Sequence, residues 1–179
     1  MLMAERTWLS TQGGWSMAET FSKEATGAIS RVLVARIMPG ADFLEALEDI
    51  VARNNITSGI ILSGIATFTE ARFHAVKLLT HDFPYPKDGF AHLHIDEVLE
   101  LISLSGTIAE YQKKPLIHCH MTVASGCEGG RVYGGHLMKG TIVYATAEIS
   151  IAEISGMKMV REVDPMLKTP QLVPLPLNE

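Results

Sequence analysis

Three of the seven histidines lie close together in the C-terminal half of the chain, in a pattern that could bind a metal ion. Residues 116–124 are apolar and β-branched and predict a β-strand. Because side chains in a strand alternate between its two faces, His118 and His120 should point to one side. If the chain turns near Glu128 and returns in antiparallel register, His136 lies opposite His120. Three imidazoles on one face are a ligand set of the catalytic zinc type, which leaves a fourth position for water.

The same stretch also allows other arrangements. Histidines in a strand are often hydrogen-bonded residues with no metal. Gly134 and Gly135 could form a bulge, and a register shift of one residue would turn His136 to the other face. Cys119 should point away from the histidines. Cys127, in the turn, is an alternative metal ligand.

A second His-x-His pair, His92 and His94, is an alternative metal site. Asp96 follows it closely, and His74 and His81 are near it in sequence. No predicted strand fixes the geometry of these side chains, and a histidine in a loop is most often simply solvated.

Two glutamates are candidate proton acceptors beside such a metal. Glu148 lies inside an apolar segment that predicts a strand, and Glu100 lies in an earlier one. A carboxylate in either place could act as a general base or orient a histidine through a hydrogen bond. The alternative for Glu148 is a solvent-facing position on a sheet edge.

The segments around these residues predict a helix followed by several strands. Residues 31–38 predict a first strand. Asp42 is a typical helix N-cap with Glu45 as its capping-box partner, and apolar residues then recur at helical spacing up to Arg53. Further strands are expected over residues 58–76, either unbroken or with a turn, and over 97–109 and 141–154, with a loop over 79–94. This order is that of an α+β protein with a mainly antiparallel sheet and one main capping helix.

The length and composition favour one domain with an extension at each end. The chain has 179 residues, of which 47% are apolar and 20% charged, so it can bury a sizeable core. Residues 1–29 have no clear period and predict a poorly ordered N-terminal extension. Residues 30–163 should form the domain, and residues 164–179 a proline-rich tail.

Charge and cysteine content argue against several classes of protein. The formal net charge is −5, and the chain has no run of Lys and Arg residues. It therefore lacks the basic surface that strong autonomous binding of nucleic acid requires. Two cysteines and no secretory signal favour a cytoplasmic protein. No apolar run is long enough to predict a membrane span. The apolar strands have more surface than one helix can cover, which predicts an oligomer.

Several short motifs, in their order along the chain, resemble those of a known family. They are RIMPGAD (36–42), SGI (58–60), LSGI (62–65), LELISLSGT (99–107), HCH (118–120), GGHL (134–137) and YATAEI (144–149). Over residues 31–163 the chain resembles the plant-and-prokaryote-conserved (PPC) domain, a domain of unknown function that also carries a DNA-binding label.

The resemblance implies an α+β fold and a homotrimer. Plant members have AT-hook motifs ahead of the domain, which bind the minor groove of A·T-rich DNA. Prokaryotic members are usually stand-alone, and some look able to hold zinc at their H-x-H and G-G-H-L motifs. By motif match, His118, His120 and His136 would be the ligands here. The chain has no Arg-Gly-Arg-Pro core, so direct DNA binding is expected to be weak.

Two functions of different class follow. One is a trimeric binding or regulatory module that holds a metal, with zinc as the expected ion, and that could be associated with DNA through partners. The other is a small zinc-dependent hydrolase or lyase. In that enzyme zinc would lower the pKa of bound water to about 7, and Glu148 or Glu100 would be the base. The sequence identifies neither a substrate nor a partner.

Overall fold

The computed structural model describes residues 22–77, 83–127 and 129–177. Its helical elements are α1 (Phe43–Arg53) and the short 3₁₀ helix η1 (Lys87–Gly89). Its strands are β1 (Ala28–Arg36), β2 (Gly59–Val76), β3 (Phe90–Ile95), β4 (Leu99–Tyr111), β5 (Lys114–Ser125), β6 (Val132–Leu137), β7 (Ile142–Ser155), β8 (Met157–Val163) and β9 (Pro170–Pro176). Most of the extension predicted over residues 1–29 lies outside the described residues.

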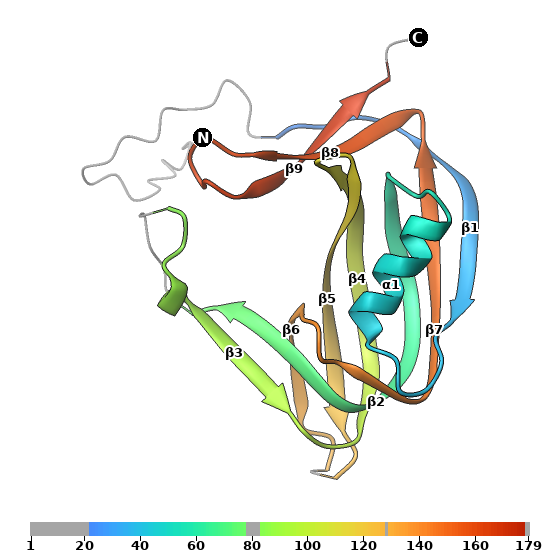
Figure 1. The fold of residues 1–179 in the computed structure, drawn as a ribbon, viewed down its shortest axis with the longest axis vertical. Helices are drawn as coiled ribbons and strands as arrows, with labels where there is room; N and C mark the ends of the chain where they lie inside the picture. The colour runs from blue at the N-terminus through green and yellow to red at the C-terminus, as the bar shows by residue number, and fades with distance from the viewer. Residues whose placement is uncertain (1–21, 78–82, 128, 178–179) are drawn as a thin grey trace, which may run out of the picture.

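The strands form one mainly antiparallel sheet with a single α-helix against it, in the part of the chain that the structure describes (Figure 1). The strand order is β1-β7-β2-β6-β5-β4-β8-β9, and β3 pairs with β2. Only β4 and β8 run parallel among the described pairs. Strand β2 also pairs with β4, so β2, β4, β5 and β6 form a closed circuit of hydrogen-bonded neighbours. The predicted α+β class is confirmed.

Helix α1 begins where the sequence predicts. The Asp42 side chain accepts a hydrogen bond from the Glu45 backbone N–H at 3.0 Å, which satisfies a donor that the first turn leaves open. The other carboxylate oxygen of Asp42 accepts from the Gly140 N–H at 2.5 Å, and this bond ties the helix to the turn before β7. The helix buries Phe43, Leu47, Ile50 and Val51. The Phe43 ring meets Phe68 of β2 edge to face, with centroids 5.2 Å apart.

The alternation along the strands separates a core face from an outer face. On β1, Leu33 and Ala35 pack on the core, as does Ile37 just after the strand, whereas Val34 is 73% exposed. Strand β5 follows the same rule, because Cys119 is buried and His120 is exposed. Cys119 is buried in the same core cluster as the apolar residues of helix α1, and burial, with the charge of Glu48 on that helix, raises the pKa of the thiol to about 12. The histidines of β5 are therefore on the side of the sheet away from the helix.

Residues 59–76 form one long strand, which is one of the two arrangements that the sequence allowed. Two other segments differ from the sequence expectations. The predicted loop over residues 79–94 is wrong for its last part, because residues 90–95 form β3 and pair with the end of β2. The C-terminal residues form the β8–β9 hairpin, where an extended tail was expected. The predicted strands at residues 31–38, 97–109 and 141–154 are present with shifted ends. No described helix has the length and apolar character to cross a membrane.

Candidate functional site: a cluster of histidines on the outer face

His118, His120 and His136 meet on the outer face, as their spacing predicts. His120 is directly opposite His136 in the β5–β6 ladder. One ring nitrogen from each of the three residues lies within 4.8 Å of the others. The Nε2 atoms of His118 and His120 are 3.2 Å apart. Nitrogens bound to one tetrahedral zinc at 2.0–2.1 Å are about 3.3 Å from each other, so the pair already has that spacing.

Two glycines before His136 set its position without the register shift that the sequence allowed. A Cβ on Gly134 would come within 2.8 Å of the Met121 carbonyl oxygen. A Cβ on Gly135 would come within 2.9 Å of the carbonyl oxygen of His74. Strand β6 can therefore lie close against both β5 and β2 only because these residues have no side chain. The close approach brings the His136 ring between His120 and His74.

The cluster is larger than the three predicted ligands. His74 of β2 is opposite His136, and its ring stacks on the His136 ring with centroids 4.3 Å apart and an interplanar angle of 9°. His92 of β3 is opposite His74, with centroids 6.1 Å apart. Ser105 of β4 is opposite His120. One row of five opposed residues thus crosses five strands, and four of them are histidines.

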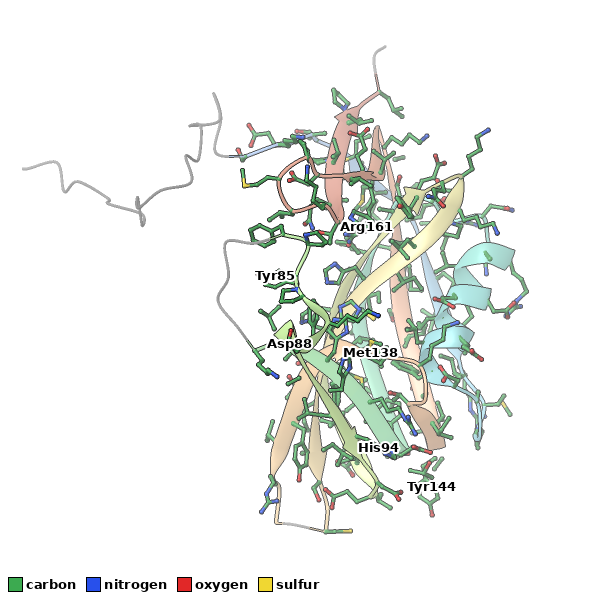
Figure 2. All side chains as sticks on the ribbon, turned by 60° about the vertical axis from the view of Figure 1, so that its left-hand side comes forward. Tyr85, Asp88, His94, Met138, Tyr144 and Arg161 are labelled. Atoms are coloured by element: carbon green, nitrogen blue, oxygen red, sulfur yellow. The ribbon has the colours of Figure 1, made fainter. Side chains whose placement is uncertain are left out.

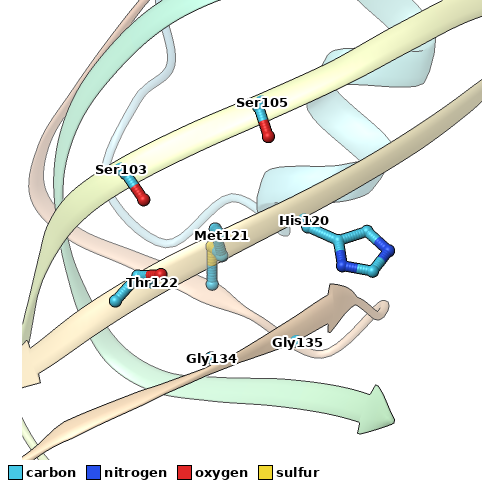
Figure 3. Close-up of a pocket in the computed structure, with 7 residues that line it drawn as sticks. All are labelled: Ser103, Ser105, His120, Met121, Thr122, Gly134 and Gly135. Carbon is cyan, nitrogen blue, oxygen red and sulfur yellow. The ribbon is translucent and has the colours of Figure 1, made fainter. Parts of the chain in front are cut away.

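A shallow depression borders the cluster. Ser103 and Ser105 project into it from β4, His120 and Thr122 lie on β5, and Gly134 and Gly135 form its β6 side (Figure 3). The Ser105 side chain is therefore opposite His120, and the Ser103 side chain is opposite Thr122, two residues further along β5. These serines were not singled out by the sequence. Their two-residue spacing in a predicted strand is the signal that could have found them.

Comparison with known proteins decides the family. Residues 24–155, more than half of the chain, match the Plants and Prokaryotes Conserved (PCC) domain. The chain belongs to this family. The PPC resemblance seen in the sequence motifs is therefore confirmed.

Solved structures share the PCC fold. A metal-containing protein from Archaeoglobus fulgidus aligns with a TM-score of 0.70 at 23% identity, over 85% of this chain and 99% of the other. A plant- and prokaryote-conserved protein from Pyrococcus horikoshii aligns with a TM-score of 0.67 at 24% identity, over 87% of this chain and 97% of the other. A candidate DNA-binding protein from Bacteroides thetaiotaomicron aligns with a TM-score of 0.66 at 21% identity, over 82% and 95% of the two chains. At these identities the likeness concerns the fold.

One curated relative is the bifunctional protein GlmU of Synechococcus sp. (strain JA-3-3Ab), which is 30% identical over 140 residues. The match covers 78% of this chain and 20% of that protein. The PCC chain thus spans about a fifth of the length of this relative.

The surroundings of the PCC histidines favour neutral imidazoles. Burial lowers the pKa of His136 to about 4, and the neighbouring His74, His118, His120 and Arg161 add to the effect. Burial, followed by the charge of Arg161, also lowers the pKa of His118. The pKa of His74 is lowered by burial and by its histidine neighbours. Since metals bind the neutral form of imidazole, the site is prepared for a cation at neutral pH.

The second His-x-His pair does not form a comparable group. His92 lies at the edge of the row, beside His74. His94 instead contacts the carboxylate of Glu70 at 2.6 Å. Within the described residues, one group of side chains lies close enough together to share a metal ion, and it consists of His118, His120 and His136. His81, named with this pair in the sequence analysis, is outside the described residues.

The other candidate groups lie away from the cluster. Glu100 is opposite Ala124, four residues along β5 from His120, or about 13 Å. Glu148 is exposed on β7, opposite Ile65 of β2, and is hydrogen-bonded by Thr146. Cys119 is buried, Cys127 is exposed, and both are free thiols. The solvent-facing alternative for Glu148 is therefore the one that the structure supports.

Proposed function

We propose that this PCC-domain chain is a trimeric binding or regulatory module that holds one zinc ion at His118, His120 and His136. The observation that carries the proposal is the convergence of three imidazole nitrogens within 4.8 Å on one sheet face. A zinc ion with three protein ligands has one open position and supplies a Lewis acid at that position. The residues of the chain favour the neutral form of His118 and His136, fix the spacing of the three imidazoles and place the Ser105 hydroxyl group opposite His120.

The donor set also fits copper and nickel, so zinc is proposed over these by the usual availability of the metals. The test is metal analysis of the purified protein after growth with added metals. We expect close to one equivalent of zinc per chain, and less than a tenth of an equivalent in His136→Ala. The matched control is His94→Ala, which removes an exposed imidazole on β3 and should keep the metal. Parent protein with less than a tenth of an equivalent of any transition metal would refute the site.

Exposed apolar side chains on the outer face support a trimer. Val34 of β1 is 73% exposed, Ile65 of β2 is 67% exposed, and Tyr144 of β7 is 53% exposed. These strands are neighbours in the sheet. Large apolar side chains exposed on neighbouring strands are often covered by a partner at a protein–protein interface. Light scattering at micromolar concentration should give three times the monomer mass, and replacing Val34 and Ile65 with serine should reduce it.

An association with DNA would run through partners rather than through this chain alone. The net charge of −5 offers few cations to neutralise phosphates. Lys113 and Lys114 lie at the β4–β5 turn and are the one adjacent basic pair. We expect binding of the isolated protein to duplex DNA to be no tighter than micromolar at physiological salt. Tighter binding that weakens steeply with salt would contradict this part of the proposal.

A further inference from the structure

Arg161 of β8 is a buried cation without an acidic partner in the described part of the chain. The residue is 8% exposed. Its guanidinium donates hydrogen bonds to the Thr107 hydroxyl at 3.1 Å and to the Pro170 carbonyl oxygen at 3.4 Å. Its Nε is buried and has no hydrogen-bond partner. Burying a guanidinium without a carboxylate costs free energy, so such a residue needs a physical reason.

The guanidinium lies beside the histidine cluster. Thr107, which accepts its hydrogen bond, is directly opposite His118 in the β4–β5 ladder. Opposed β-carbons are about 4.5–5.5 Å apart, so the Arg161 head group is one side chain away from the His118 ring. Figure 2 labels Arg161 on the β8 strand.

The groups gathered there attract negative charge. A fixed guanidinium and a free Nε donor lie on one side of the imidazoles. The hydroxyl groups of Ser103 and Ser105 line the depression on the other side of His120 (Figure 3). Glu100 is about 13 Å away along the sheet. An arginine fork matches the planar geometry of a carboxylate or the oxygens of a phosphate.

We propose that Arg161 forms an anion subsite beside the three-histidine site, so that the ligand of this protein is a small molecule bearing a carboxylate or phosphate group. This inference rests on the proposed metal function, because the metal ion would be the second point at which the ligand is held. One oxygen of the carboxylate or phosphate group pairs with the guanidinium of Arg161, and the rest of that anionic group faces the imidazoles. The anion supplies the counter-charge that the described fold does not.

The test is a calorimetric titration of the metal-loaded protein with inorganic phosphate and, separately, with malonate. We expect the parent to bind at least one of these anions, and Arg161→Gln to weaken that binding by about 10- to 100-fold, the range that a charge-assisted hydrogen bond supplies. Arg161→Lys keeps the positive charge but lacks the forked guanidinium, so its anion affinity should lie between that of the parent and that of Arg161→Gln. Arg53→Gln is the control, because Arg53 is an exposed residue of α1 that pairs with Asp49. The preferred anion then distinguishes a phosphate ligand from a carboxylate ligand.

Metal content is measured on the same samples, which separates the two proposals. If the parent and Arg161→Gln hold equal zinc and neither binds either anion, the anion subsite is wrong and the metal site stands. If the parent holds no metal, the proposed function fails, and an anion affinity that depends on Arg161 would still support the subsite. If Arg161→Gln instead changes the mass in light scattering and the parent binds neither anion, Arg161 pairs with a carboxylate of another copy, which overturns the inference. Thr107→Val removes the hydroxyl that orients the guanidinium and provides a second, milder variant, with a smaller loss of affinity expected.

Discussion

Two His-x-His pairs lie on different strands of the same sheet. One is His118 and His120 on β5, and the other is His92 and His94 on β3. In the first pair the two Nε2 atoms are 3.2 Å apart, and a third imidazole lies within reach. In the second pair, His94 is bound to Glu70, and His92 lies beside His74. The local spacing of the two pairs is identical, and their environments are not.

The difference lies in the neighbouring strands. Strand β5 has β6 on one side and β4 on the other, so His120 receives His136 from one neighbour and Ser105 from the other. Strand β3 pairs with β2 alone among the described strands. In both places an adjacent strand supplies a third imidazole in register, His136 opposite His120 and His74 opposite His92. The β5 pair is the metal-site candidate because His118 lies beside His120, whereas β2 also places Glu70 against His94 and so draws that imidazole away. The motif by itself does not distinguish the two places.

The largest expected effect separates the two pairs directly. His120→Ala should weaken zinc binding by more than about 100-fold, because loss of a group that only orients a ligand already costs 10- to 100-fold. His94→Ala should leave the affinity unchanged. A competition titration with a chelating dye measures both. Equal losses in the two variants would mean that the pairs are equivalent and that the comparison is wrong.

Removal of the metal should come next in size. Zinc at about 100 times its dissociation constant adds about 2.7 kcal/mol to the free energy of unfolding. For a chain of this length, that is about 5–10 °C in the melting temperature. Melting curves with and without chelator at pH 7.5, 5.5 and 4.0 should show an increment that shrinks at pH 5.5 and is absent at pH 4.0. An increment that does not change with pH would exclude imidazole ligands.

The metal-free protein should also lose stability in acid. The folded pKa of His136 is about 4, below the value of about 6.5 that is usual for an unfolded chain. Between these two values the unfolded state binds more protons, so the free energy of unfolding falls as the pH is lowered from about 6.5 to 4. His136→Ala should flatten this part of the pH profile of the chelated protein. An unchanged slope would place the titrating group elsewhere.

Cys119→Ser tests the strand between the two metal ligands. The thiol is buried on the helix side of β5, so a hydroxyl there should cost about 1–3 kcal/mol of stability. The metal content should stay at the parental level, because residue 119 faces away from the imidazoles. Loss of metal in this variant at a temperature where it is folded would contradict the assigned face.

The smallest effect is expected for Glu70→Gln. The contact between Glu70 and His94 is partly exposed, and such pairs contribute about 0–1 kcal/mol. Zinc affinity should not change. Urea unfolding of the variant measures the change in stability, and the dye competition measures the zinc affinity. A lower zinc affinity would show that the β3 pair supports the β5 site.

The three-histidine convergence was predictable because it depends on local information. Alternation places His118 and His120 on one face, and a short turn brings His136 back opposite His120. The N-cap at Asp42 was predictable for the same reason, since the cap and its partner are three residues apart. In the cap, Asp42 and its partner Glu45 are three residues apart, and in the metal-site candidate all three histidines belong to one hairpin of consecutive strands.

The role of His74 was not predictable in this way. Its contact with His136 requires β2 to pair with β6, and two strands so distant in the chain give no local signal of their pairing. His74 and His92 are near each other in the sequence, and the two are directly opposed in the β2–β3 ladder. That this pair joins the main cluster could not be predicted from their spacing.

Prolines explain both missed strands. Pro84 and Pro86 precede β3 and favoured a loop. In β9, Pro170, Pro174 and Pro176 are opposite Val163, Met159 and Met157 of β8. These are alternate residues on the last strand of the sheet, where a missing N–H faces away from the ladder. A proline-rich composition is therefore compatible with an edge strand, which the composition alone could not indicate.

The closed circuit of β2, β4, β5 and β6 has a consequence for how the molecule opens. Strands β5 and β6 are paired on both edges, so each of their amide hydrogens is bonded to one neighbouring strand or the other and exchanges with solvent only when that ladder breaks. Strand β8 joins the circuit through one described pair with β4, between Val160 and Glu110. Slow exchange is thus expected around the imidazoles and faster exchange around Arg161. The three histidines are therefore expected to keep their spacing in local openings that expose the β8–β9 hairpin.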